Sequence, residues 1–324
     1  MPSQPAIDSH SIGRFLIIEL TRATERAAVA AARLRGHGDE MAADMAAVSA
    51  MHDHLSALPA HGRVVIGEGD GGHIRFGDML GAAAAPRVDL AVAPLEGATL
   101  CAKDMAGAVS VAAAAAEGAL LNAPDVYMDK IAIGPGYPDG LVDLDRSPGD
   151  NIAALAAARG VSPADIAVCI LDRPRHADLI AKCRRAGARV RLISDGDIAG
   201  VIVTADRETT GVDMYLGRGG APEGVLAAAA LACVGGQMQG RLALDTPEQR
   251  ARAASHGIID PDRKYALRDM VRGDVVVCVT GVTDGPLAGG VVFGKGYVEM
   301  ETIAYRSATR TVRRIRARRP IDGG

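Results

Sequence analysis

The chain has 324 residues, 48% of them hydrophobic and 23% charged, with a formal net charge of −3 at pH 7. These values are those of an ordinary globular protein that buries a large core. The slightly acidic charge excludes an electrostatic reason to expect a nucleic acid or an anionic membrane as partner.

The sequence contains neither a membrane span nor a disulfide pattern. No stretch approaches the roughly 20 apolar residues that cross a bilayer, and no basic-then-apolar signal opens the chain, so we expect a cytoplasmic protein. The five cysteines are scattered and never form a CxxC pair. We therefore expect them to be small buried hydrophobes rather than disulfide partners or zinc ligands.

Two helices are predicted at the start of the chain. Residues 14–35 are rich in alanine and other strong helix formers. Asp39 is suited to cap a second helix over residues 40–58, because its side chain accepts hydrogen bonds from free backbone N–H groups. Asp44 then falls in the early turns of this second helix.

Two short apolar runs, 63–66 and 88–92, predict strands that end in acidic loops. Glu68 follows the first run and Glu96 follows the second. In α/β sheets, ligand sites gather at the edge where strands end. Residues 106–119 favour a helix by propensity, whereas a Glu-Gly pair near their end is typical of a turn after a strand.

The middle of the chain is predicted to form a loop and then a βαβ unit. Residues 122–138 are rich in proline and glycine and contain Tyr127. A strand over 166–171, a helix over 177–186 and a strand over 189–193 follow with short connections.

Arginines and aspartates occupy the exits of the two strands of this unit. Arg173 and Arg175 are suited to bidentate phosphate binding, and Asp195 and Asp197 are suited to accepting hydrogen bonds from sugar hydroxyls. The alternative is that these arginines and aspartates form surface salt bridges with one another. His176 is expected to belong to a helix start rather than to act as a catalytic base.

A glycine-rich loop, residues 217–224, is predicted between a strand over 213–216 and a helix from about Val225. Its backbone amides and the helix N-terminus favour an anion, although Glu223 repels a phosphate unless a metal ion lies between them. The alternative is a tight turn that needs glycine for its backbone angles.

Two late strands are predicted, over residues 274–280 and 302–315. The basic run 313–320 overlaps the second strand and lacks interleaved aromatic residues, so we expect a solvated edge rather than a nucleic-acid surface. Neither an internal repeat nor a flexible linker is visible in the sequence.

Four acidic residues follow predicted strands or lie near helix starts: Asp44, Glu68, Glu96 and Glu223. Mg²⁺ and Mn²⁺ bind carboxylate oxygens, and phosphate hydrolysis benefits from metal ions that activate water and neutralise the phosphoryl group. Each residue alone is explained as a solvated loop carboxylate. Together, beside loops suited to phosphate, the four residues predict a metal site.

Seven segments, in order along the chain, resemble the class II fructose-1,6-bisphosphatases: GHGDEMAADMAAVSAM, VVIGEGD, VDLAVAPLEGATLCAKD, LLNAPDVYMDKIAIGPGY, LDRPRHADLI, RLISDGD and GRGGAPEGV. The similarity extends from about Ile17 to about Ile315. It implies the layered αβαβα sandwich, an α/β fold, of the inositol-phosphatase superfamily, in which residues 106–119 contain a strand. It also implies hydrolysis of the 1-phosphate of fructose 1,6-bisphosphate with Mg²⁺ or Mn²⁺, in gluconeogenic or photosynthetic carbon metabolism.

The resemblance further implies a role for each residue at a position of the family's motifs. The metal ligands are expected to be Asp44, Glu68, Glu96 and Glu223, and Glu68 is also expected to be catalytic. Thr99 is not at a family position, and we expect it as a second catalytic residue only because it lies one residue after the position of the family's threonine. The positions that bind the sugar bisphosphate are Glu96, Gly97, Ala98, Tyr127, Arg173, Pro174, Arg175, Asp195, Gly196, Asp197 and Gly220. We expect a homo-oligomer whose N-terminal lobe, residues 1–165, binds metal and whose C-terminal lobe, residues 166–324, binds the sugar phosphate, in one intimately packed unit.

The sequence departs from the family at two catalytic positions. Ala93 replaces an aspartate that binds metal, and Ala98 replaces a threonine that positions or activates the attacking water. An acidic stretch after Glu68 is also replaced. The candidate substitutes are Asp70, Asp78, Asp89 and Thr99, although strand alternation turns Asp89 away from its neighbours.

Three functional interpretations follow from these departures. The first is an active bisphosphatase with a rearranged metal site. The second is an impaired paralogue that binds a sugar phosphate or modulates an active partner subunit. The third is a phosphatase with a changed substrate, such as sedoheptulose 1,7-bisphosphate or an inositol phosphate. Each loss is expected to slow turnover by orders of magnitude, since general acid–base help alone contributes about 10²–10⁴-fold.

Overall fold

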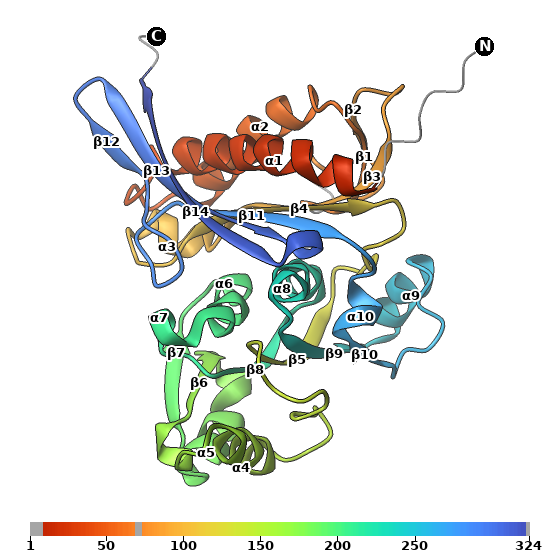
Figure 1. Ribbon diagram of the computed structural model, residues 1–324, viewed down its shortest axis with the longest axis vertical. Helices are drawn as coiled ribbons and strands as arrows, with labels where there is room; N and C mark the ends of the chain where they lie inside the picture. Colours follow the sequence, from red (N-terminus) through yellow and green to blue (C-terminus); the bar gives the residue numbers. More distant parts are fainter. Residues whose placement is uncertain (1–8, 69–72, 322–324) are drawn as a thin grey trace.

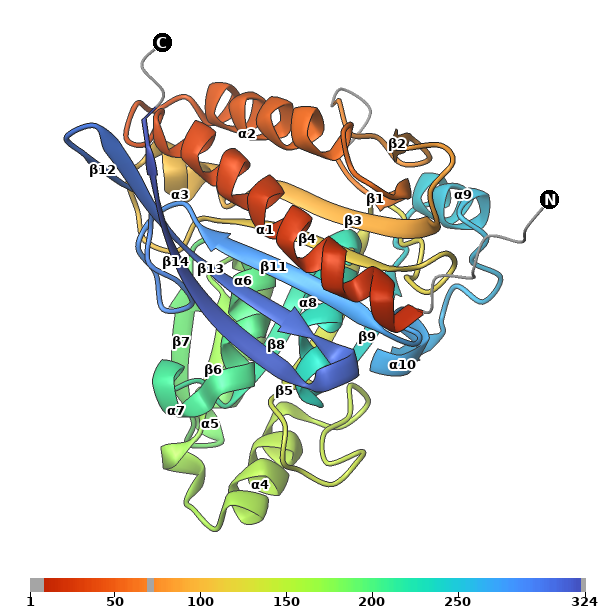
Figure 2. The ribbon, with the colours of Figure 1, turned by 45° about the horizontal axis from the view of Figure 1, so that its top comes forward.

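The computed structural model, which describes residues 9–68 and 73–321, is a stack of alternating helical and sheet layers (Figure 1). Helices α1 (Ser9–Ala32) and α2 (Glu40–Leu55) form the first layer, and Figure 2 shows them side by side over the first sheet. Asp39 caps α2 as expected, since its Oδ1 accepts a hydrogen bond from the N–H of Ala42 at 2.9 Å.

The first sheet has eight strands in the order β12-β13-β11-β4-β3-β1-β2, with β14 paired to β13. These strands are β1 (His61–Ile66), β2 (Met79–Gly81), β3 (Arg87–Glu96), β4 (Val109–Ala116), β11 (Val275–Gly281), β12 (Val292–Gly294), β13 (Tyr297–Arg306) and β14 (Thr311–Pro320). The short helix α3 (Ala98–Ala102) follows β3 directly.

The second sheet has six strands in the order β10-β9-β5-β8-β6-β7. They are β5 (Tyr127–Ile133), β6 (Ala167–Leu171), β7 (Arg189–Ile193), β8 (Met214–Gly220), β9 (Gln237–Ala243) and β10 (Lys264–Ala266). Between the two sheets lie α6 (Asp197–Ile202) and α8 (Ala221–Val234), and the outer face of the second sheet is covered by α4 (Pro148–Arg159) and α5 (Ala177–Arg185) (Figure 1). The remaining helices are α7 (Arg207–Thr210), α9 (Pro247–Ser255) and α10 (Leu267–Met270).

Three clusters of buried apolar side chains fill the spaces between these layers. Strand β4 contributes to two of them, because successive side chains of a strand point to opposite faces. Val111 and Ala113 face α8 and the second sheet, whereas Ala112 and Ala114 face α1. Small side chains on both faces let the helical layers approach the sheet closely. The expected αβαβα architecture is thus confirmed.

Several local expectations are also confirmed. Strand β4 lies within residues 106–119, where propensity alone favoured a helix. Strands β6 and β7 pair in parallel on either side of α5, which is the expected βαβ unit. All five cysteines are buried and free. Among the described residues, none of the helices is both long enough and apolar enough to cross a bilayer.

Three expectations about loops and strands are wrong. Residues 122–138 are not all loop, because β5 lies within them and forms the centre of the second sheet. The predicted loop 217–224 is absent, since β8 continues through Gly220 in register with β5 and α8 begins at Ala221. The single strand expected over 302–315 is the antiparallel hairpin of β13 and β14.

The two sheets do not divide the chain at residue 165. Strand β5 precedes that position and belongs to the second sheet, while β11 to β14 follow it and belong to the first. The expected lobes therefore stay a prediction about where metal and sugar phosphate bind.

Replacement of Ala113 with leucine is expected to lower the free energy of unfolding by about 1–3 kcal/mol, because overpacking forces neighbours out of their preferred positions. Ala113 is fully buried, whereas Ala116 at the end of the same strand is exposed. Ala116→Leu is therefore the matched control, with an expected effect within about 0.5 kcal/mol. Urea unfolding measures both, and equal effects would contradict close packing of this layer.

Candidate functional site

The four expected carboxylates come from separate elements. Glu68 lies two residues after β1, Glu96 is the last residue of β3, Glu223 is in the first turn of α8, and Asp44 is in the second turn of α2. Asp44 and Glu223 lie close enough to Glu68 to raise its pKa, and Glu223 lies close enough to Glu96 to raise its pKa as well. The fold therefore brings together the residues that the sequence grouped.

A chain of direct contacts connects this group to the aspartate that begins α6. Oε1 of Glu96 accepts a hydrogen bond from the N–H of Ile198 at 3.1 Å. The neighbouring Asp197 forms an ion pair through Oδ2 with Nζ of Lys130, on β5. Lys130 Nζ also donates to the carbonyl of Gly220 at 2.7 Å, three residues before Glu223. Strands β3, β5 and β8 and helices α6 and α8 thus meet at one site.

The two adjacent glycines of β8 make this meeting possible. A Cβ atom on Gly219 would collide with the Asp197 carboxylate, and a Cβ atom on Gly220 would collide with the Glu223 carboxylate. The two glycines of the segment Gly-Gly-Ala-Pro-Glu are therefore needed mainly for steric reasons, because the two carboxyl groups occupy the volume that side chains would fill.

The pKa values of these carboxyl groups are raised. Burial, and then the negative charges of Asp44 and Glu223, raise the pKa of Glu68 to about 7. Burial and the charge of Asp197 raise the pKa of Glu223 to about 7, although Lys130 opposes the shift. Burial raises the pKa of Glu96 well above its usual range, helped by Asp197 and Glu223. Burial also raises that of Asp44. Crowded, desolvated carboxylates of this kind are stabilised by a cation.

The donor set fits a divalent cation, but its ligands are not already arranged as a cage. Oε2 of Glu223 is buried without a hydrogen-bond partner, which leaves an oxygen available to a ligand. Carboxylate oxygens are the donors that Mg²⁺ and Mn²⁺ prefer. Within residues 9–68 and 73–321, however, no three histidine, cysteine, aspartate or glutamate side chains lie close enough together to hold a metal ion. These side chains therefore have to move for a cation to bind among them.

Two of the residues expected to bind the sugar phosphate form a stacked pair at the start of β5. The guanidinium of Arg175 lies over the ring of Tyr127, with 4.8 Å between its central carbon and the ring centroid. Tyr127 is directly opposite Gly220 in the β5–β8 register. Arg173, followed by Pro174, lies 3.9 Å from Asp195. The alternative of surface salt bridges thus applies to Arg173 but not to Arg175, which donates to the carbonyl of Arg218.

Gly97 and Gly196 both occupy the left-handed region of backbone conformation, with φ values of 85° and 81°. Gly97 precedes α3 and Gly196 precedes α6, so each lets the chain turn sharply from a strand exit into a helix. Ala98 and Thr99 are the first two residues of α3, and this turn presents them beside Glu96.

The structure places three of the four candidate substitutes for the missing groups. Asp89 is fully buried and accepts a hydrogen bond from the N–H of Leu120, so its carboxylate supports the fold. Asp78 accepts from the N–H of Arg75 in a turn. Thr99 lies beside Ala98 in α3, and Asp70 is outside the described residues.

Lys130 is the functional residue that sequence reasoning missed. Its side chain is only 1% exposed and faces α8 with Met128, two residues earlier on β5. Residues 128–133 read Met-Asp-Lys-Ile-Ala-Ile, which has no apolar–polar alternation, so the sequence carries no signal that places this lysine on the buried face of a strand. His176 is no catalytic base in this geometry, since its Nε2 accepts from the N–H of Arg218 and its Nδ1 contacts the carbonyl of Leu171.

Comparisons with known proteins identify the family of the chain. The family model described as bacterial fructose-1,6-bisphosphatase, glpX-encoded, matches residues 14–319. A protein of Synechococcus sp. (strain JA-3-3Ab) is 39% identical over 324 aligned residues, which cover 91% of this chain and 93% of the relative. One from Synechococcus sp. (strain RCC307) is 40% identical over 317 residues, covering 93% and 94%. Both are named D-fructose 1,6-bisphosphatase class 2/sedoheptulose 1,7-bisphosphatase. The chain described here belongs to the family of glpX-encoded bacterial fructose-1,6-bisphosphatases.

Proposed function

We propose that this protein hydrolyses the 1-phosphate of fructose 1,6-bisphosphate, giving fructose 6-phosphate and phosphate, with Mg²⁺ or Mn²⁺ as cofactor. The main support is the convergence of carboxylates from β1, β3, α2 and α8, each with a raised pKa, around one site. The names of the relatives make sedoheptulose 1,7-bisphosphate the alternative substrate.

We assign the cation to Asp44, Glu68, Glu96 and Glu223. When bound, a divalent cation supplies positive charge that activates water and neutralises the phosphoryl group. The strongest structural support is the unpartnered Oε2 of Glu223, beside the crowded carboxyl groups. Lys130 adds a positive charge near Glu223 and forms an ion pair with Asp197.

We assign the sugar and its distal phosphate to the opposite end of the same site. Arg173 and Arg175 supply guanidinium groups for the phosphate, and the ring of Tyr127 holds Arg175 in position. Asp195 and Asp197 accept hydrogen bonds from sugar hydroxyls. The turns at Gly97 and Gly196 bring backbone amides close to the reacting phosphate.

A second candidate function rests on Ala93 and Ala98. Neither side chain has an oxygen atom, and Asp89 on the same strand is already bonded to Leu120. Thr99, in the first turn of α3 three residues after Glu96, carries a hydroxyl group, and we propose it as the helper of the attacking water. If Thr99 does not serve, the protein binds a sugar bisphosphate without rapid turnover. The homo-oligomer, the cytoplasmic location and the role in gluconeogenesis stay predictions of the sequence.

The purified protein is expected to release phosphate from fructose 1,6-bisphosphate when Mg²⁺ or Mn²⁺ is present and to stop when the metal is chelated. Glu223→Gln is expected to lower kcat/KM by about 100-fold or more, because it removes a charged ligand while keeping the shape. Glu117→Gln, in an exposed turn, is the matched control. Substrate binding by calorimetry without any metal-stimulated release would favour the second candidate function.

The double change Ala93→Asp and Ala98→Thr tests whether the missing groups limit the rate. We expect kcat to rise by about 10²-fold or more, since each restored group acts on the water or the metal. Measured phosphate release at saturating metal gives the comparison. An unchanged kcat would mean that Thr99 and the four carboxylates already form a complete but different site.

The crowding of carboxylates predicts a stability that depends on both pH and metal. A carboxyl group with a raised folded-state pKa stabilises the fold below its unfolded value near 4.5, and this contribution is lost as pH rises through about 7. The metal-free melting temperature is therefore expected to fall between pH 5 and 8, by an amount equivalent to roughly 2 kcal/mol for Glu68.

Addition of Mg²⁺ or Mn²⁺ at pH 8 is expected to restore most of this loss. Thermal unfolding with and without chelator measures the effect. Glu68→Gln should flatten the metal-free pH dependence and reduce the metal effect, whereas Glu117→Gln should change neither. A melting temperature that responds to metal equally in Glu68→Gln and in the unaltered protein would refute Glu68 as a ligand.

A further inference from the structure

Strand β8 loses one of its two neighbouring strands before it ends. On one side, β5 pairs with it along its whole length, from Met214 to Gly220. On the other side, within the part of the chain that the structure describes, β6 pairs with it only at Met214 and Tyr215. The backbone N–H and C=O groups that later residues of β8 direct to the β6 side therefore need other partners, because buried backbone groups are rarely left unpaired.

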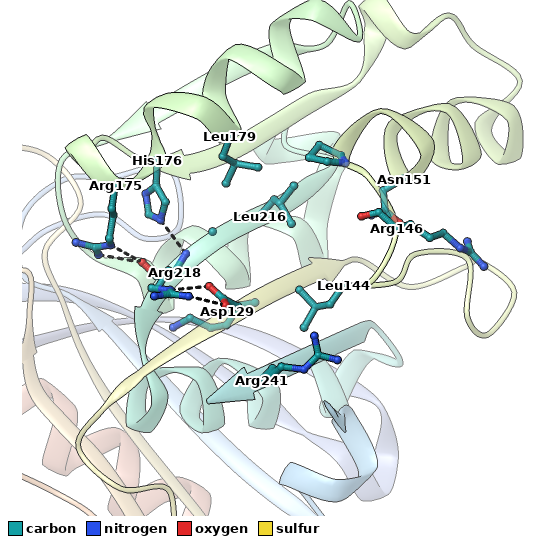
Figure 3. Close-up of a pocket in the computed structure, with 13 residues that line it drawn as sticks. Asp129, Leu144, Arg146, Asn151, Arg175, His176, Leu179, Leu216, Arg218 and Arg241 are labelled. Atoms are coloured by element: carbon teal, nitrogen blue, oxygen red, sulfur yellow. Dashed lines mark hydrogen bonds and ion pairs between the residues drawn. The ribbon is translucent and has the colours of Figure 1, made fainter. Parts of the chain in front are cut away.

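At Arg218, two side chains take the place of the missing strand. The N–H of Arg218 donates to Nε2 of His176 at 2.8 Å. The carbonyl of Arg218 accepts from Nη2 of Arg175 at 2.9 Å and from its Nε at 3.3 Å. The N–H and C=O of one strand residue point to the same edge, as they would toward a neighbouring strand. Figure 3 shows His176 and Arg175 both directed at the backbone of Arg218.

The two hydrogen bonds of His176 fix which of its ring nitrogens carries the proton. The side chain is only 3% exposed, and its Nδ1 lies 2.8 Å from the carbonyl oxygen of Leu171, at the end of β6. A carbonyl oxygen can only accept and the Arg218 N–H can only donate, so Nδ1 carries the proton and Nε2 presents its lone pair. A neutral imidazole therefore bridges the end of β6 to β8.

The surroundings of the ring favour this neutral state. Burial lowers the pKa of His176, although the bond to Leu171 opposes the shift. Among the charged groups that face the ring, Arg175 and Arg218 lower its pKa further, whereas Asp129 raises it. The acceptor for the Arg218 N–H is therefore present at neutral pH.

The carbonyl of Arg218 in turn holds the guanidinium of Arg175. Two N–H groups of Arg175 share this oxygen, and the guanidinium also lies over the ring of Tyr127 at 4.8 Å. The side chain of Arg218 is itself anchored by a bidentate ion pair with Asp129, at 2.8 and 2.9 Å. A guanidinium that is held in one place binds phosphate at a smaller cost in conformational entropy than a free one.

We propose that His176 is a positioning residue for the distal phosphate of the substrate. It fixes the backbone of Arg218 through the N–H, so that the carbonyl of the same residue holds Arg175 where the phosphate binds. This role rests on the phosphate-binding function proposed above for Arg175. It requires a side chain at position 176 that accepts a hydrogen bond at the place of Nε2, and it does not require an imidazole as such.

Fructose 6-phosphate, titrated by calorimetry in the presence of chelator, is the probe, because it carries only the phosphate assigned to the arginines. His176→Asn keeps a donor for Leu171 but places no acceptor at the Arg218 N–H, and should weaken binding by about three- to tenfold. The longer amide of His176→Gln reaches the position of Nε2 and should keep the dissociation constant within about twofold. Leu155→Ala, which removes buried packing on α4, is the control for lost stability and should also stay within about twofold.

A double-mutant cycle tests whether His176 acts through Arg175. Arg175→Ala alone should weaken binding of fructose 6-phosphate by about tenfold or more, since a charge-assisted contact is lost. Addition of His176→Asn to Arg175→Ala should weaken binding by less than about twofold more, because the guanidinium that His176 positions is already absent. A full additional loss would show that His176 acts independently of Arg175 and would overturn the proposal.

The remaining outcomes separate this role from the proposed function. Equal affinities of His176→Asn and His176→Gln, beside a weakened Arg175→Ala, would overturn the positioning role alone. An unchanged affinity in Arg175→Ala would overturn both the phosphate-binding function of Arg175 and the role of His176. Nitrogen-15 NMR of the unaltered protein gives a check that needs no variant, since His176 should carry its proton on Nδ1 at pH 7. A proton on Nε2 would overturn the proposal.

Discussion

The buried ion pair between Lys130 and Asp197 is the interaction on which the site depends. It joins β5 to the start of α6, and the second bond of Lys130, to the carbonyl of Gly220, adds the start of α8. Removal of one partner from a buried pair costs about 3–5 kcal/mol, because the other charge is left unpaired in a medium of low polarity. The same ammonium group also offsets part of the repulsion on Glu223. Structural support and charge balance therefore come from one side chain.

Most of the fold could be predicted from local sequence, and the failures have physical causes. The βαβ unit was predictable because its strands and helix are short, regular and separated by clear turns. The run of glycines before Ala221 was interpreted as a loop, since propensity does not register that β5 supplies the hydrogen bonds of a central strand. The β13–β14 hairpin was missed because its turn, Ser307–Thr309 followed by Arg310, lacks glycine and proline.

Those residues of the site that belong to recognisable sequence motifs could be predicted. The acidic residues and the arginine pair were identified in this way, and the fold brings Asp44 and Glu68 together although 23 positions separate them. Lys130 was not identified, because no local motif distinguishes a buried lysine from a solvated one. Nor does the sequence reveal that His176 and Arg175 both bond to the backbone of Arg218, since that depends on where β6 ends beside β8.

Consecutive residues of strand β5 point to opposite faces of the second sheet. Tyr127 and Asp129 belong to the outer side of the sheet, and Met128 and Lys130 belong to the inner side. A deletion of one residue near the start of this strand would turn each later side chain to the other face of the sheet. Asp129 would then lie among the carboxylates, and Lys130 would lie among the arginines of the outer face. The spacing of residues within β5 is therefore fixed by two unlike surroundings at once.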